Sequence, residues 1–184
     1  LIQTHRTHKL IPLRGNHDIM MLNARMSKTG YREWIKRGGD ATLLSYTTLT
    51  SKPGMLKDIP ESHWHFLDNH LKPFFETETH FFVHANACPD ASLQDQPDFM
   101  LYWEKFNNPS PHESGKIMVC GHTAQKSGVP VTNGHAIFLD TFPHKRGWLS
   151  CLHIESGVIY QANQYGHTRQ LQLNELETVN ETTY

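Results

Sequence analysis

The spacing of apolar residues is helical in the first part of the chain and strand-like in the second. Apolar residues three and four positions apart predict helices over 18–26, 31–49 and 59–74. The Gly38–Gly39 pair interrupts the second of these segments, and Asp40 is predicted to cap the helical piece that follows.

Short β-rich runs, separated by Gly, Pro and Asn, predict strands in the second part of the chain. Residues 152–162 predict a hairpin that turns at Ser156–Gly157, and residues 107–116 predict a loop. A further short strand is predicted at the start of the chain, so that the predicted strands cover 9–13, 80–85, 116–122, 135–141, 147–155 and 157–164. Helices followed by strands indicate a mixed α/β fold of the α+β type.

Length and composition are those of one domain with a hydrophobic core. The chain has 184 residues, of which 38% are hydrophobic, and we expect a single domain over 1–173 followed by a polar tail over 174–184. Seventeen basic residues against eighteen acidic ones give a net charge of -1, so neither nucleic acid nor a membrane is an expected partner. Cys88, Cys120 and Cys151 are odd in number and lack metal-type spacing, which favours a reducing, cytoplasmic setting.

Polar residues with ligand chemistry follow three of the predicted strands. Asn16 and His17 come after the strand over 9–13, His84 follows the strand at 80, and His122 follows the strand at 116. Loops at strand ends are where catalytic groups concentrate, and two imidazoles with an amide oxygen suit a divalent transition metal. Taken singly, His84 and His122 could equally be histidines at the edge of the core with satisfied hydrogen bonds.

These residues lie in sequence blocks that resemble the calcineurin-like metallophosphoesterases. The blocks are LRGNHD over 13–18, FVHA over 82–85 and CGHT over 120–123, and they stand in the family order. Within that family the chain is most similar to the serine/threonine protein phosphatases of the short bacterial and phage-like branch, over residues 9–172. The resemblance implies a four-layer αββα fold, a β-sandwich flanked by helices.

The resemblance also implies roles for five residues. Asn16, His84 and His122 match ligands of the second ion in a two-metal site, which would hold manganese, or else iron or zinc. His17 matches the acid that protonates the leaving alkoxide, and an imidazole suits that task. Asp18 matches the carboxylate that orients His17, where the family more often has Glu; a carboxylate at the start of a helix could also serve as a cap.

Two further positions depart from the family pattern. Lys105 stands where the family usually has an arginine that grips the phosphate, and a lysine cannot make the planar bidentate contact of arginine. A surface lysine with no such role is an equal alternative. Residues 140–148 differ from the Asp-Thr-Gly run usual after the last strand of the site, so the shape of that loop is left open.

The first two blocks of the family, which supply the other metal's ligands and the bridging aspartate, have no counterpart in residues 1–15. We therefore expect a longer parent protein, a fold here without its N-terminal strands, and no activity from this segment alone. The expected activity of the parent is hydrolysis of phosphoserine and phosphothreonine in proteins or peptides. Two alternatives stay open: hydrolysis of dinucleoside polyphosphates, and a non-catalytic binding or scaffold domain.

Overall fold

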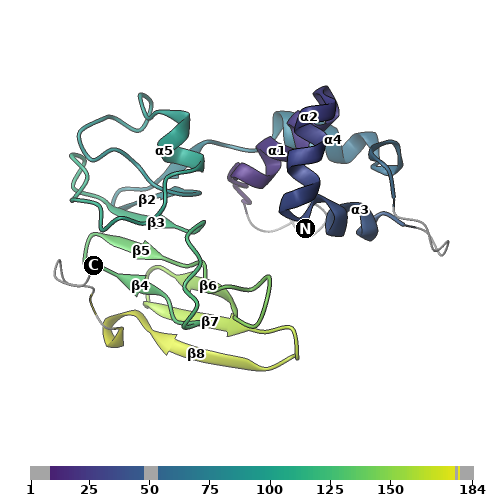
Figure 1. Ribbon diagram of the computed structural model, residues 1–184. Helices are drawn as coiled ribbons and strands as arrows, with labels where there is room; N and C mark the ends of the chain where they lie inside the picture. The colour runs from purple at the N-terminus through teal and green to yellow at the C-terminus, as the bar shows by residue number, and fades with distance from the viewer. Residues whose placement is uncertain (1–8, 48–53, 177, 179–184) are drawn as a thin grey trace. The chain divides into compact units, whose positions relative to one another are not determined.

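The described residues divide into a helical unit and a unit that contains the strands. The computed structural model describes residues 9–47, 54–176 and 178 (Figure 1). The chain separates into two compact units, Leu1–Pro73 and Phe74–Tyr184. The predicted single domain over 1–173 spans both units. The predicted tail begins within a 3₁₀ helix, η4 (Leu173–Glu175), and most of it lies outside the described residues.

The first unit contains helices in all three segments predicted from the sequence, although the third segment is helical only to Asn69 and residues 48 and 49 of the second lie outside the described residues. Its buried apolar residues include Met20, Trp34 and Trp64, one from each predicted segment. The elements are α1 (Asn16–Met26), α2 (Lys28–Trp34), the π-type turn η2 (Ile35–Gly39), α3 (Asp40–Ser45), the 3₁₀ helix η3 (Leu56–Asp58) and α4 (Glu61–Asn69). The predicted interruption at Gly38–Gly39 is present, because Gly38 has a φ of 100° and breaks the helical path between α2 and α3.

Two details predicted for this unit are wrong. Residues 9–13 form no strand; Leu13 makes one isolated bridge to Lys72, and Pro12 lacks the N–H group that would extend the ladder toward the start of the chain. Asp40 is not an N-cap, since its φ of -61° and ψ of -44° are already helical and Gly39 precedes it as the capping residue.

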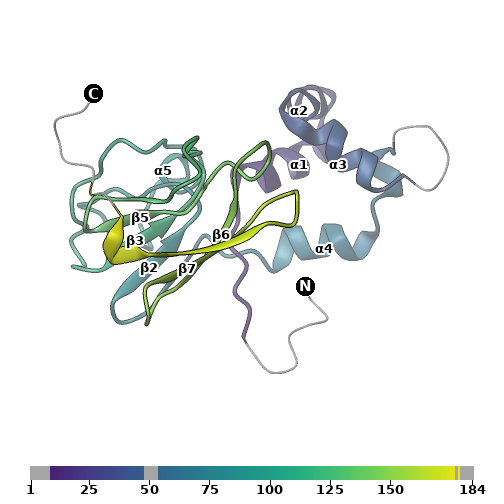
Figure 2. The same ribbon diagram turned by 90° about the horizontal axis from the view of Figure 1, so that it is seen from below.

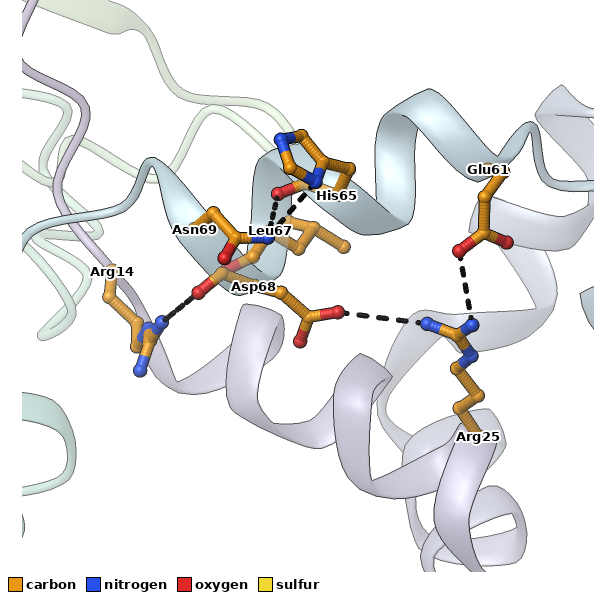
Figure 3. A network of polar contacts seen from close by, with 7 residues as sticks. All are labelled: Arg14, Arg25, Glu61, His65, Leu67, Asp68 and Asn69. Atoms are coloured by element: carbon orange, nitrogen blue, oxygen red, sulfur yellow. Dashed lines mark hydrogen bonds and ion pairs between the residues drawn. The ribbon is translucent and has the colours of Figure 1, made fainter.

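Both ends of α1 are tied to α4 by a network of polar contacts (Figure 3). Arg14, just before α1, donates from Nη2 to the carbonyl oxygens of Leu67 and Asp68, both at 3.4 Å. At the other end, Arg25 pairs with Glu61 at 3.2 Å and with Asp68 at 3.6 Å, and its guanidinium lies 5.0 Å from the centre of the Trp64 ring. The arginines therefore set the position of α4 along α1.

The second unit holds two sheets and one short helix, α5 (Asp98–Tyr102). A five-stranded mixed sheet has the order β1-β2-β3-β5-β4, with β2 parallel to β3 and β3 parallel to β5. A three-stranded antiparallel sheet has the order β6-β7-β8, which Figure 1 shows side by side, and Figure 2 shows β6 and β7 from below. The strands are β1 (Phe74–Glu76), β2 (His80–Val83), β3 (Ile117–Cys120), β4 (Val131–Thr132), β5 (Ala136–Phe138), β6 (Leu149–His153), β7 (Val158–Ala162) and β8 (Thr168–Gln172).

The mixed α/β class predicted from the sequence is confirmed. The predicted hairpin is the β6–β7 pair, and Gly157 supplies the positive φ of 68° that its turn requires. Strands β1, β4 and β8 and helix α5 were not predicted. In the described part of the chain, no helix combines the length and apolar character needed to cross a membrane.

The three-stranded sheet buries one face and is joined through it to the loop after β3. Ile159 and Gln161 of β7 are buried, whereas Tyr160 between them is 48% exposed. Gln161 donates from Nε2 to the Gly128 carbonyl at 3.0 Å, and Arg169 donates to the same oxygen at 2.7 Å. The side chains of β7 and β8 therefore fix the loop that begins at the CGHT block.

Gly30 allows α2 to approach the end of α1, and its replacement by alanine should be destabilising. A Cβ there would lie 2.4 Å from the backbone oxygen of Asn23, which cannot move without shifting α1. We expect Gly30→Ala to lower the free energy of unfolding by about 1–3 kcal/mol, although alanine is the better helix former. Urea unfolding followed by circular dichroism measures the change. Thr29→Ala, at an exposed neighbour, is the control, and equal stability of the two variants would contradict the close contact.

Candidate functional site

His84 and His122 follow neighbouring parallel strands. β2 ends at Val83 and β3 ends at Cys120, and Phe82 lies opposite Val119 in the pairing. Parallel neighbours carry their carboxyl ends to the same edge of a sheet, so the residues that follow them are brought together. The Gly121 N–H donates to the His84 carbonyl at 2.9 Å. The main chains therefore stay hydrogen-bonded beyond the ends of β2 and β3, up to the residues that carry the imidazoles.

The two imidazoles are in hydrogen-bond contact, and a main-chain carbonyl sets their tautomers. His84 Nε2 lies 3.2 Å from His122 Nδ1, and His122 Nε2 lies 3.1 Å from the Trp103 carbonyl oxygen. A carbonyl only accepts, so His122 Nε2 carries a hydrogen and donates to Trp103. In the neutral ring, Nδ1 of His122 is then the acceptor, and His84 donates to it from Nε2.

This pair is spaced as two ligands of one metal ion are spaced. Ring nitrogens at roughly 2.0–2.1 Å from a shared ion lie about 3–3.4 Å apart in octahedral or tetrahedral geometry, which brackets the observed 3.2 Å. The bond from His122 Nε2 to a carbonyl is the arrangement that fixes a metal-binding histidine, leaving Nδ1 for the ion. Among the described residues no group of three or more His, Cys, Asp or Glu is placed to hold a metal. His84 and His122 each bring one imidazole to this site.

His122 also has a strained backbone. Its φ is 63°, a region that residues other than glycine seldom adopt, and Phe142 in the loop after β5 has a φ of 64°. Thr123 makes two hydrogen bonds that stabilise the turn at His122. Its N–H donates to the Gly121 carbonyl, and its Oγ1 accepts from the Phe106 N–H at 2.8 Å. The surrounding hydrogen bonds therefore offset the strain that places this imidazole.

Three residues that orient the site were not predicted from the sequence. They are Trp103, whose carbonyl accepts from His122; Thr123, which holds the 103–106 segment; and Asn86, whose buried side chain donates to the Lys105 carbonyl at 3.3 Å. Trp103 contributes a main-chain carbonyl and Thr123 a hydroxyl, and neither has a sequence signature; Asn86 contributes its side-chain amide. Asn86 directly follows the FVHA block, and this position in the sequence was the one available signal.

Lys105 itself is exposed, on the segment that follows α5. Its carbonyl is engaged by Asn86, which fixes the main chain while the ammonium group extends to solvent. The position is open to an anionic ligand, and equally to water. The predicted phosphate contact of Lys105 stays a prediction.

Asn16, His17 and Asp18 form the first turn of α1 in the helical unit. Asn16 is buried, His17 is exposed and Asp18 is half-buried. Asp18 Oδ2 accepts from the Gly15 N–H at 2.7 Å, so the carboxylate acts as a helix-start group, which is the alternative considered for it. Burial raises the pKa of Asp18, while the Gly15 hydrogen bond and the charges of Arg14 and His17 act in the opposite direction. Its predicted role in orienting His17 stays a prediction.

Comparisons with protein-family models, with curated proteins and with solved structures find no match for this chain.

If the backbone at His122 is strained, glycine should be better tolerated there than alanine. Both substitutions remove the imidazole, but only alanine keeps the side-chain clash of a positive φ, so we expect His122→Gly to be more stable by roughly 1 kcal/mol. Urea unfolding of the two variants gives the difference. At an ordinary strand or helix position glycine is the less stable of the pair, so that order at position 122 would rule out the strain.

Proposed function

We propose that this chain is part of a metal-dependent phosphomonoesterase that acts on phosphoserine and phosphothreonine in proteins. The observation that carries the proposal is the 3.2 Å separation between His84 Nε2 and His122 Nδ1, at the ends of two adjacent parallel strands. These are the residues that the FVHA and CGHT blocks single out through their resemblance to calcineurin-like metallophosphoesterases. The proposal includes the αββα arrangement of that family as the finer description of the mixed α/β fold.

In this proposal His84 and His122 hold a divalent ion, with manganese favoured over iron or zinc. His122 would bind through Nδ1 while its Nε2–H stays on the Trp103 carbonyl, and His84 would bind through Nε2 in the tautomer that carries its hydrogen on Nδ1. The sequence resemblance, rather than the geometry, adds Asn16 to this set. When bound, a pair of such ions supplies hydroxide at neutral pH and neutralises charge on the phosphate oxygens.

The remaining residues of the proposal bind the phosphate and move a proton. The exposed imidazole of His17 would donate its proton to the oxygen of the departing serine or threonine. Asp18, which matches the orienting carboxylate of the family, would hold the imidazole of His17 in position. Lys105 would attract the phosphate as a point charge, with less directional control than an arginine. Three free cysteines accord with the cytoplasmic setting that we propose for the enzyme.

Metal binding tests the histidine pair directly. We expect isothermal titration calorimetry with Mn²⁺ and with Zn²⁺ to show binding, and His84→Ala and His122→Ala each to weaken it by at least about tenfold. His153→Ala, at an exposed histidine of β6, is the matched control and should bind as the wild type does. Asn16→Ala tests the ligand that rests on the resemblance alone. Equal affinity of the wild type and both histidine variants would refute the site.

Catalysis is tested on the protein expressed with any coding sequence that precedes Leu1. With Mn²⁺, we expect hydrolysis of a phosphoseryl peptide, and a loss of about 10²–10⁴-fold in kcat for His17→Ala. His153→Ala should leave the rate unchanged. Turnover of diadenosine tetraphosphate but not of the peptide would identify the enzyme as a dinucleoside polyphosphate hydrolase instead. Unchanged activity of His17→Ala would show that His17 is not the general acid. Metal binding without hydrolysis of either compound would favour a scaffold domain over an enzyme.

A further inference from the structure

A groove lies at the corner where α1 passes into α2. α1 ends at Met26, and Ser27 caps α2 by accepting from the Gly30 N–H at 3.0 Å while its own N–H donates to the Asn23 carbonyl. These bonds hold the corner in one conformation. The groove beside it, the α1–α2 groove, has a volume of about 520 Å³ and is completed by Leu56 of η3.

Apolar and basic side chains share the lining of this groove. Met26 is 82% exposed, and Tyr31 and Leu56 add further apolar surface. Large apolar side chains at an exposed position mark interaction surfaces when they stand together rather than singly. Methionine in particular adapts its shape to different apolar partners, because its side chain is unbranched and flexible.

The basic residues of the groove differ in how far their charge is already balanced. Arg25 forms ion pairs with Glu61 and Asp68 of α4, so its charge is already balanced. Lys28 and Arg32 are exposed and lie one turn apart on α2, and in the ranges 9–47 and 54–176 neither forms an ion pair. The groove therefore combines an apolar surface with two positive charges that lack an acidic partner in the described structure.

We infer that the α1–α2 groove binds a short acidic segment of a partner protein, with an apolar side chain seated on Met26, Tyr31 and Leu56. Acidic side chains on either side of that anchor would pair with Lys28 and Arg32, because complementary charge at the rim of an apolar contact gives specificity. Two cations and a net chain charge of -1 are too little for a nucleic-acid backbone or an anionic membrane. This inference does not depend on the proposed phosphoesterase activity.

Selection from a display library of short random peptides, with the intact chain as the target, tests the proposal. We expect the selected peptides to contain an aromatic or large aliphatic residue flanked by Asp or Glu. Their affinity, measured by fluorescence anisotropy, should fall by at least about tenfold for the double variant Lys28→Glu, Arg32→Glu. Met26→Ser should weaken the same peptides several-fold, through loss of apolar contact.

The control is a double variant with the same change in net charge elsewhere, Lys126→Glu, Arg146→Glu, at two exposed positions of the second unit. It should bind the peptides as the wild type does. All four positions of the two double variants are exposed, and circular dichroism verifies that each variant is folded. Three results would overturn the inference: no selected peptide, selected peptides without acidic residues, or equal affinity of both double variants. Displacement of the peptides by a single-stranded oligonucleotide at low concentration would instead indicate a polyanion site and would also overturn it.

Discussion

The parallel pairing of β2, β3 and β5 is the constraint on which the candidate site depends. Parallel strands pair stably only when both faces of the sheet are covered, and the apolar residues Phe81, Met118 and Ile137 are buried in the core. Main-chain hydrogen bonds hold the register, including those from the Met118 N–H to the His135 carbonyl and from the Gly121 N–H to the His84 carbonyl. Once the register is fixed, the loops after β2 and β3 must begin side by side, and His84 and His122 with them.

Main-chain groups then convert this proximity into a defined pair of imidazoles. The Trp103 carbonyl selects one tautomer of His122, and that tautomer decides which nitrogen faces His84. The carbonyl is itself held in place, because Asn86 binds the chain two residues later and Thr123 binds it at Phe106. Removing the Asn86 side chain would thus act on the histidines through the backbone between Trp103 and Lys105.

The sequence predicted the elements whose own residue pattern favours a helix, a strand or a turn. It missed the elements that form only because they pair with a neighbouring strand. Apolar periodicity identified α1 and the core strands, and the Ser156–Gly157 turn identified the β6–β7 hairpin. β8 was missed because its sequence, TRQLQ, is polar and becomes a strand only by pairing along β7. The strand predicted at 9–13 failed for the opposite reason: within the described residues, this apolar run pairs only at Leu13, with Lys72. His84 and His122 could be selected by residue type, but the carbonyl that orients them could not.

In the first turn of α1, the carboxylate of Asp18 stabilises the start of the helix and can also interact with His17. Asp18 binds the Gly15 N–H through Oδ2, and this bond satisfies a donor at the start of the helix that would otherwise lack a partner. A carboxylate has two oxygens, and capping occupies one of them. The charge of His17 lowers the pKa of Asp18, so the two groups interact electrostatically in addition to the hydrogen bond that Asp18 makes. Capping therefore fixes where the charge of Asp18 lies relative to His17, and a glutamate, one methylene longer, would place it differently.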